Sequence, residues 1–173
     1  MRLELEKLEK RGEIAHVYQP HELSLDDTEL LLIEPAQVRG RISRKGEEVE
    51  LSGAIRTSVE TPCARCLKPV SVPIDAEFSE RFVPAVSWRG EEQHELASDD
   101  LNLSVFDGES IDLDQLVREE IVLATPDQIL CREDCKGLCP TCGVDRNSVA
   151  CECDAAQIDS RWEKLRDLRF LDF

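Results

Sequence analysis

Cysteine is the residue type in this sequence best placed to do chemistry. The chain has eight cysteines, and six of them fall between positions 131 and 153. Two pairs, Cys63 with Cys66 and Cys139 with Cys142, are separated by two residues. Thiolates at this spacing bind metal ions, form disulfides or carry out redox reactions. The candidate metal ligands are Cys63, Cys66, Cys131, Cys135, Cys139, Cys142, Cys151 and Cys153.

The form of the two close pairs favours zinc. A structural zinc ion takes four thiolate or imidazole ligands in a tetrahedron, with sulfur at about 2.3 Å. A pair of cysteines with two residues between them wraps one face of the ion in a tight turn, called a knuckle. In residues 139–142, Pro140 restricts that turn, and Gly143 just after it permits a positive φ angle. A second knuckle at residues 63–66 and four further cysteines then indicate two zinc ions.

Eight ligands can be divided between two sites in two ways. The preferred division makes one site from the last four cysteines and the other from the 63–66 knuckle with Cys131 and Cys135. The alternative joins Cys131 and Cys135 to the 139–142 knuckle and leaves the last two cysteines for the 63–66 knuckle. Cys131, Cys135 and Cys139 recur every four residues and can face either way, so the sequence leaves both divisions open.

Three other uses of cysteine compete with zinc. A thioredoxin-like redox pair should follow a strand and open a helix, whereas Cys66 leads through Pro69 into a strand pattern and Cys142 leads into a loop. Disulfides require an oxidising compartment. An iron-sulfur cluster also takes four thiolates, but a knuckle followed by glycine is typical of zinc.

The composition indicates a globular cytoplasmic protein. The first residues alternate charges with single leucines and lack the apolar core of a secretory signal, and the longest apolar runs are too short to cross a bilayer. We therefore expect a reducing compartment, which favours metal binding over disulfides. We expect neither a membrane partner nor a small-molecule substrate.

The net charge of −16 is concentrated in one region. Residues 85–123 contain eleven acidic residues and two arginines. Such a surface repels phosphate backbones and attracts basic partners, which argues against nucleic-acid binding by the whole protein surface. The segment is either a solvated loop that aids solubility or a face that binds a basic partner.

The elements that must position the cysteines can be read from the apolar pattern. Residues 36–60 predict a strand, a turn at Lys45-Gly46 and a second strand, in which Gly53 suggests a bulge. Residues 70–78 alternate strictly and predict a further strand. The 63–66 knuckle therefore lies in a tight turn between two antiparallel strands.

The second half of the chain predicts helices around the cysteine cluster. Residues 85–100 predict a loop, and residues 101–106 predict a short strand. Asp112 is the predicted N-cap of an amphipathic helix that ends before Pro126. Residues 154–173 contain apolar positions that fit a terminal helix.

These patterns predict an α+β fold. It has an antiparallel β-rich body with a CxxC hairpin, an amphipathic helix, and a C-terminal cysteine-rich zinc module followed by a helix. We place the body in residues 1–125 and the zinc-binding module with its terminal helix in residues 126–173. No nucleotide-binding, hydrolase or metalloprotease motif is present in the sequence. Eight sulfurs in two closed sites leave no open metal position, which argues against an enzyme.

The motifs resemble those of the YceD family of bacterial and plastid proteins. The resemblance rests on Cys-x-Arg-Cys-Leu-x-Pro-Val from Cys63, Ile-Val-Leu-Ala-x-Pro from Ile121, and the cysteine cluster from Cys131 to Cys153. Lys-Gly-Leu between Cys135 and Cys139 makes it more specific than a generic zinc ribbon. The resemblance implies a noncatalytic role in ribosome biogenesis, through accumulation or processing of large-subunit (23S) rRNA.

That role predicts a large-subunit ribosomal protein, an assembly factor or rRNA as the partner. An acidic protein holds a basic ribosomal protein more easily than it coats RNA. Local cations beside the knuckles are candidates for partner or rRNA contact, namely Arg65, Lys68, Lys136 and Arg146. The alternative functions are a CxxC thiol-disulfide oxidoreductase and a zinc-ribbon module of another nucleic-acid machine.

Overall fold

The computed structural model of the chain describes residues 1–8, 10–25, 29–88, 102–153 and 161. Strands dominate, and two α-helices accompany them among these residues, so the fold is α+β. The elements in chain order are β1 (Arg2–Glu4), the 3-10 helix η1 (Leu5–Lys7), β2 (Arg11–Tyr18), β3 (Leu31–Leu32), β4 (Ala36–Lys45), β5 (Glu48–Pro62), β6 (Pro69–Pro84), α1 (Ala85–Trp88), β7 (Leu103–Phe106), β8 (Ser110–Asp112) and α2 (Leu113–Ala124).

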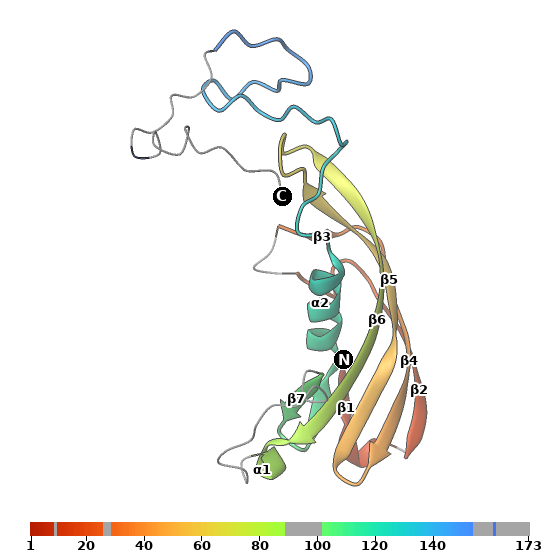
Figure 1. Ribbon diagram of the computed structural model, residues 1–173. Helices are drawn as coiled ribbons and strands as arrows, with labels where there is room; N and C mark the ends of the chain where they lie inside the picture. Colours follow the sequence, from red (N-terminus) through yellow and green to blue (C-terminus); the bar gives the residue numbers. More distant parts are fainter. Residues whose placement is uncertain (9, 26–28, 89–101, 154–160, 162–173) are drawn as a thin grey trace, which may run out of the picture.

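The main sheet is long and curved (Figure 1). Its strands lie in the order β2-β4-β5-β6-β7, and β3 pairs with β5. Neighbouring strands are antiparallel except for β7, which pairs with β6 in parallel. Strands β1 and β8 form a separate antiparallel ribbon. The predicted antiparallel body is thus confirmed, while a parallel strand at its edge departs from the prediction.

Strands β5 and β6 form the hairpin that carries the first knuckle. Their register continues without interruption from Val49 beside Phe82 to Pro62 beside Pro69. The turn between the two strands is residues 63–68, as the sequence predicts. Because both strands are long, this turn lies at one end of the molecule, where the cysteine-rich segment meets it (Figure 1).

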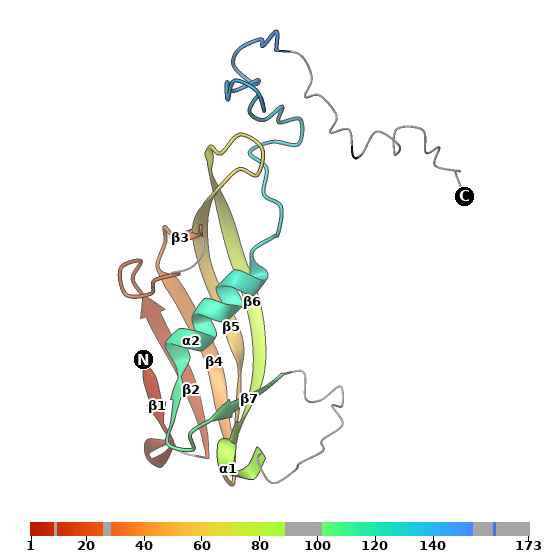
Figure 2. The same ribbon diagram turned by 90° about the vertical axis from the view of Figure 1, so that its left-hand side faces the viewer.

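Helix α2 packs across the concave face of the sheet (Figure 2). It begins where the sequence predicts, because the Asp112 side chain accepts hydrogen bonds from the N–H groups of Asp114 and Gln115. The buried side chains of the helix are those of the predicted apolar stripe, Leu113, Leu116, Val117 and Ile121. Burial of each aliphatic side chain contributes about 1.5–3 kcal/mol, which fastens the helix to the sheet.

Glycines let two strands approach closely at the middle of the sheet. Gly40 on β4 pairs with Gly53 on β5, and Gly53 pairs with Phe78 on β6. A β-carbon on Gly53 would lie 2.9 Å from the Phe78 ring and 2.3 Å from the Arg39 carbonyl oxygen. The bulge predicted at Gly53 is therefore wrong. The glycine is needed for close packing, and the register passes through it unbroken.

Two other sequence predictions meet the structure differently. Residues 85–88, predicted as part of a loop, form the short helix α1. Residues 89–101 of the acidic segment lie outside the described residues, and so does the terminal helix predicted for residues 154–173, apart from position 161. Among the residues that the structure describes, no helix is long and apolar enough to cross a membrane.

Candidate metal centres at the tip of the sheet

The first group of four cysteines joins the β5–β6 hairpin to the segment after α2. We call it the hairpin site, and it consists of Cys63, Cys66, Cys131 and Cys135. Two long-range backbone hydrogen bonds hold the segments together. The Ala64 N–H donates to the Ile129 carbonyl at 2.8 Å, and the Leu138 N–H donates to the Arg65 carbonyl at 3.0 Å. Three of the four cysteines are buried, and Cys131 is exposed.

The second group lies within the tail of the described chain. We call it the tail site, and it consists of Cys139, Cys142, Cys151 and Cys153. Only Cys139 is buried, so this site is more open to solvent than the hairpin site. The structure groups the eight cysteines as in the preferred division. Whether these groups hold metal stays a prediction.

Sulfur distances fit tetrahedral coordination better than disulfide bonding. Within each site all four sulfurs lie within 4.8 Å of one another. The Sγ atoms of Cys66 and Cys131 are 3.6 Å apart, and those of Cys142 and Cys151 are 3.5 Å apart. A disulfide requires about 2.05 Å, and all eight cysteines are free. A tetrahedral zinc ion with sulfur at about 2.3 Å requires sulfurs about 3.8 Å apart.

Backbone N–H groups favour the thiolate of one cysteine in each site. The Cys131 N–H lies 3.4 Å from the Cys63 sulfur, and this hydrogen bond is the main cause that lowers the pKa of Cys63 to about 6. The Cys142 N–H acts in the same way on Cys139, whose pKa is also lowered to about 6. Each site therefore offers a preformed thiolate near neutral pH.

Neighbouring sulfurs have the opposite effect on a second cysteine in each site. The Cys66 side chain raises the pKa of Cys131 to about 12, and the Cys151 side chain raises the pKa of Cys153 to about 12. Four thiolates crowded together repel one another unless a cation lies between them. A bound divalent metal ion would remove this penalty, and metal binding would release protons.

Two polar residues that the sequence analysis did not single out support the sites. Asn147 donates through Nδ2 to the Cys135 sulfur at 3.4 Å, and its Oδ1 accepts from the Lys136 N–H at 2.8 Å. Asp145 pairs with Lys68 at 2.7 Å and so ties the tail segment to the hairpin. Lys68 and the Asn147 N–H hold the pKa of Asp145 well below its usual range. Both residues lie between Cys142 and Cys151 in the sequence, so polar side chains between two ligands of the tail site were the available signal.

The four predicted contact cations differ in their surroundings. Arg65 donates to the Cys135 carbonyl at 2.8 Å, and Lys68 is paired with Asp145, so both have partners within the chain. Lys136 and Arg146 are exposed, and their side chains have no partner among the described residues. These two are the cations of the set that remain available for a partner.

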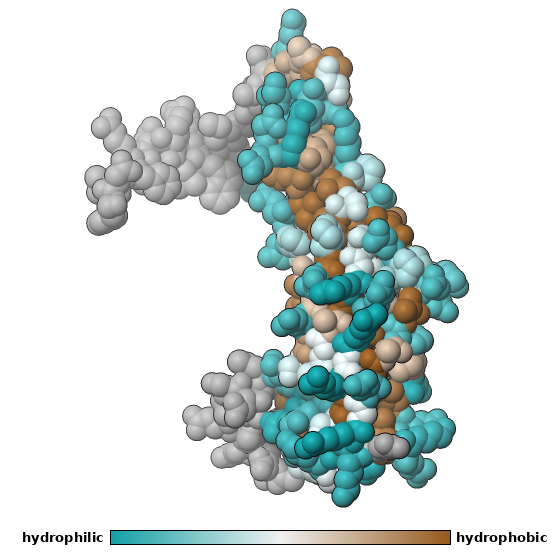
Figure 3. All heavy atoms as spheres, turned by 90° about the vertical axis from the view of Figure 1, so that its right-hand side faces the viewer, coloured by the Kyte–Doolittle hydropathy of each residue, from teal (hydrophilic) through white to brown (hydrophobic). Residues whose placement is uncertain are grey.

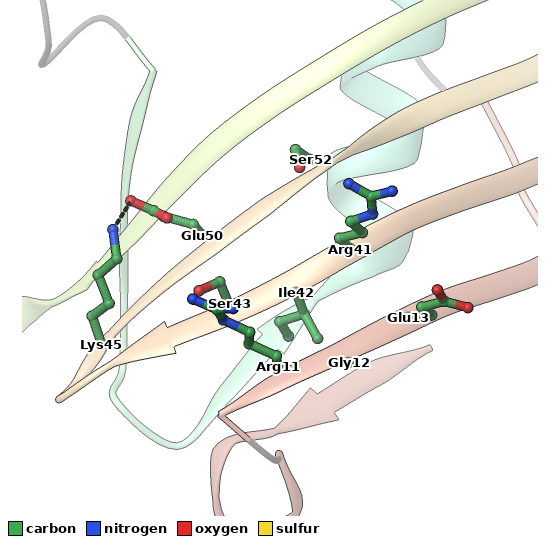
Figure 4. Close-up of a pocket in the computed structure, with 9 residues that line it drawn as sticks. All are labelled: Arg11, Gly12, Glu13, Arg41, Ile42, Ser43, Lys45, Glu50 and Ser52. Carbon is green, nitrogen blue, oxygen red and sulfur yellow. Dashed lines mark hydrogen bonds and ion pairs between the residues drawn. The ribbon is translucent and has the colours of Figure 1, made fainter.

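Hydrophilic side chains gather on the convex face of the sheet (Figure 3), and arginines lie there together with glutamates. Arg11 and Arg41 line a shallow hollow there with Ser43 and Ser52 (Figure 4), while Lys45 is paired with Glu50 at 3.0 Å. Arg39 lines the adjoining hollow. The three arginines have no partner in the part of the chain that the structure describes. Arg39 and Arg41 alternate within the strand predicted from residues 36–60, which was the sequence signal for a common face, whereas Arg11 lay outside the predicted strands.

Comparison with known proteins identifies the family. The family model described as "Large ribosomal RNA subunit accumulation protein YceD" matches residues 51–169, a stretch that contains both cysteine sites. The chain belongs to the YceD family. The description of the YceD family names rRNA accumulation and no enzyme class, which supports a role in ribosome biogenesis.

Relatives come from bacteria and plants. An uncharacterized Mycobacterium bovis protein is 34% identical over 128 residues, which cover 74% of this chain and 59% of the relative. The uncharacterized protein YlbN of Bacillus subtilis is 29% identical over 149 residues, 86% of this chain and 82% of YlbN. The chloroplastic YCED homolog 1 of Arabidopsis thaliana, named for large ribosomal RNA subunit accumulation, is 28% identical over 156 residues, 78% of this chain and 49% of its own length.

The chain thus spans about three fifths of the length of the mycobacterial relative. No solved structure is a significant match to the present chain.

Proposed function

We propose that the protein is a noncatalytic, cytoplasmic zinc-binding factor in ribosome biogenesis. It promotes accumulation or processing of large-subunit rRNA by binding a ribosomal protein, an assembly factor or the rRNA itself. Membership of the YceD family supports the assignment to ribosome biogenesis. The single observation that carries the proposal is the two groups of four cysteines. In each group the four sulfurs lie within 4.8 Å of one another, which supports metal binding.

In this proposal each zinc ion has a structural role. The hairpin site fastens residues 126–153 to the end of the β5–β6 hairpin, and the tail site folds the segment that follows. Residues 1–125 and 126–173 then act as a body and a module joined through metal. With four sulfurs on each ion no coordination position is left for a substrate, so the ions stabilise structure and do not activate water.

The basic residues suggest where rRNA would lie. Arg11, Arg39 and Arg41 on the convex face offer guanidinium groups that pair with phosphates. Lys136 and Arg146 at the tip are cations for contact with either rRNA or a protein partner. The acidic segment of residues 85–123 would instead hold a basic ribosomal protein. Two surfaces of opposite sign suit a factor that meets both components of a ribonucleoprotein.

Depletion of the protein from its source cells tests the proposal. We expect large-subunit rRNA to fall relative to small-subunit rRNA, and we expect the wild-type chain to restore the ratio. A Cys139→Ser variant that has lost metal should restore it less well at equal protein level. An unchanged rRNA ratio on depletion would refute the role in large-subunit assembly.

The thiol oxidoreductase is the alternative that the cysteines themselves raise. Neither CxxC pair precedes a helix in the described residues: Cys66 leads into β6, and Cys142 is followed by Gly143 in a turn. Metal analysis combined with thiol titration separates the two functions. Metal-free protein with a readily cycled dithiol would favour the oxidoreductase.

A further inference from the structure

Leu67 adopts a backbone conformation that suits glycine and not leucine. Its φ angle is 59°, and it is the one residue other than glycine with positive φ among the described residues. A side chain branched beyond Cβ is sterically strained in this region. The Leu67 side chain gains little in return, because the residue is 63% exposed. Leu67 therefore does not serve the stability of the fold.

The second knuckle shows which residue the fold itself prefers. In the first knuckle the Leu67 N–H donates to the Cys63 carbonyl at 3.0 Å, and the Cys63 N–H donates to the Lys68 carbonyl at 2.8 Å. In the second knuckle Gly143 and Cys139 make the same two bonds, each at 2.8 Å. The two positions are equivalent, and Gly143 takes a φ of 72°. Glycine at position 67 would satisfy the same hydrogen bonds without strain.

The surroundings of Leu67 indicate what kind of partner it meets. The knuckle sits at the end of the β5–β6 hairpin, and the Arg65 carbonyl beside it contacts residues 137–138. The exposed cations Lys136 and Arg146, which have no side-chain partner among the described residues, flank that contact, because the Arg146 N–H donates to the Gly137 carbonyl at 3.0 Å. The tip therefore combines the exposed Leu67 side chain with the cations Lys136 and Arg146. A second exposed aliphatic side chain, Val149, and the exposed acidic residues Glu133 and Asp134 lie in the cysteine-rich segment.

An aliphatic side chain has few complementary surfaces on a phosphate backbone, whereas a protein pocket removes it from water. We propose that Leu67 is the anchor by which the tip docks onto a protein partner. The partner offers an apolar pocket bordered by acidic side chains, which complement Lys136 and Arg146. Strain at functional positions of this kind persists when function requires the side chain. The inference rests on the proposed function and names the class of partner at the tip.

The test replaces Leu67 in the full chain in two ways. Leu67→Gly removes both the side chain and the strain, and Leu67→Asn keeps a side chain that tolerates positive φ but is polar. Leu123→Asn is the matched control, because Leu123 is 78% exposed on α2 and lies outside the tip. We expect every variant to retain both metal ions. We expect the unfolding midpoint of Leu67→Gly to stay equal or rise by about 1–3 °C.

The binding probe is large-subunit precursor particles purified from cells that lack the protein, used intact and after removal of their proteins. We expect both Leu67 variants to bind intact particles about tenfold or more weakly than the wild type, the effect of losing one buried leucine. Leu123→Asn should bind as the wild type does. Residual binding to deproteinised rRNA should not depend on residue 67.

Three results would overturn the inference. The first is wild-type affinity in Leu67→Gly. The second is a drop of several degrees in the unfolding midpoint of Leu67→Gly, which would mean that Leu67 packs within its own chain. The third is an equal loss of affinity on deproteinised rRNA, which would make RNA the partner. If the wild type binds no particle, the proposed function fails instead. Growth of cells lacking the protein then decides: full rescue by Leu67→Gly overturns the inference, and no rescue at equal protein level supports it.

Discussion

The hairpin site should stabilise the whole β body, whereas the tail site should stabilise only its own segment. Cys66 and Cys131 are separated by 65 positions in the sequence, and Cys142 and Cys151 by 9. A cross-link lowers the conformational entropy of the unfolded chain and so raises the free energy of unfolding. The expected gain is about 4 kcal/mol for the longer separation and about 2.5 kcal/mol for the shorter one. For a chain of this size, 4 kcal/mol corresponds to about 10 °C in the unfolding midpoint.

The perturbation is a pair of matched substitutions. Cys131→Ser and Cys142→Ser each remove one exposed sulfur, so neither creates a cavity in the core. Each variant should hold one metal ion fewer than the wild type. The unfolding midpoint of the strands, followed by far-ultraviolet circular dichroism, should lie about 10 °C below that of the wild type in Cys131→Ser. In Cys142→Ser this midpoint should be nearly unchanged. Equal melting of the two variants, or full metal content in Cys131→Ser, would refute the reasoning that metal fastens the tail to the hairpin.

Three further outcomes follow from the same structure. Asn147→Ala removes a hydrogen bond to the Cys135 sulfur, so metal affinity measured by competition with a chelator should fall about 10- to 100-fold. Gly53→Ala places a β-carbon 2.3 Å from the Arg39 carbonyl oxygen and should cost about 2 kcal/mol or more in urea unfolding. If the acidic segment grips a basic partner, its neutralisation should weaken the complex and flatten its salt dependence. The residues to neutralise are Glu91, Glu92, Asp99 and Asp100.

Elements whose determinants lie close together in the sequence could be predicted from the sequence alone. Helix α2 was predictable because the Asp112 cap and the apolar stripe lie within one short segment. The β5–β6 hairpin was predictable because both strands alternate on either side of one turn. Strand β7 pairs in parallel with β6 across residues far apart in the sequence, and no local pattern carries that pairing. The function of Gly53 likewise depends on Gly40 and Phe78 on neighbouring strands.

The candidate site was predictable in its ligands but not in their grouping. Cys131 and Cys135 can face either site by spacing alone, and the choice depends on tertiary hydrogen bonds such as that from Ala64 to Ile129. The same limit applies to Lys68, which is a free cation by sequence. Its partner Asp145 follows α2 in the sequence and becomes a neighbour of Lys68 only when the cysteine-rich segment meets the hairpin.

The most direct test of the account is a metal count on the purified full chain by native mass spectrometry, with sulfur coordination measured by X-ray absorption. We predict two zinc ions per chain, each bound by four sulfurs at about 2.3 Å. Metal-free protein with eight titratable thiols, or iron in place of zinc, would contradict the account.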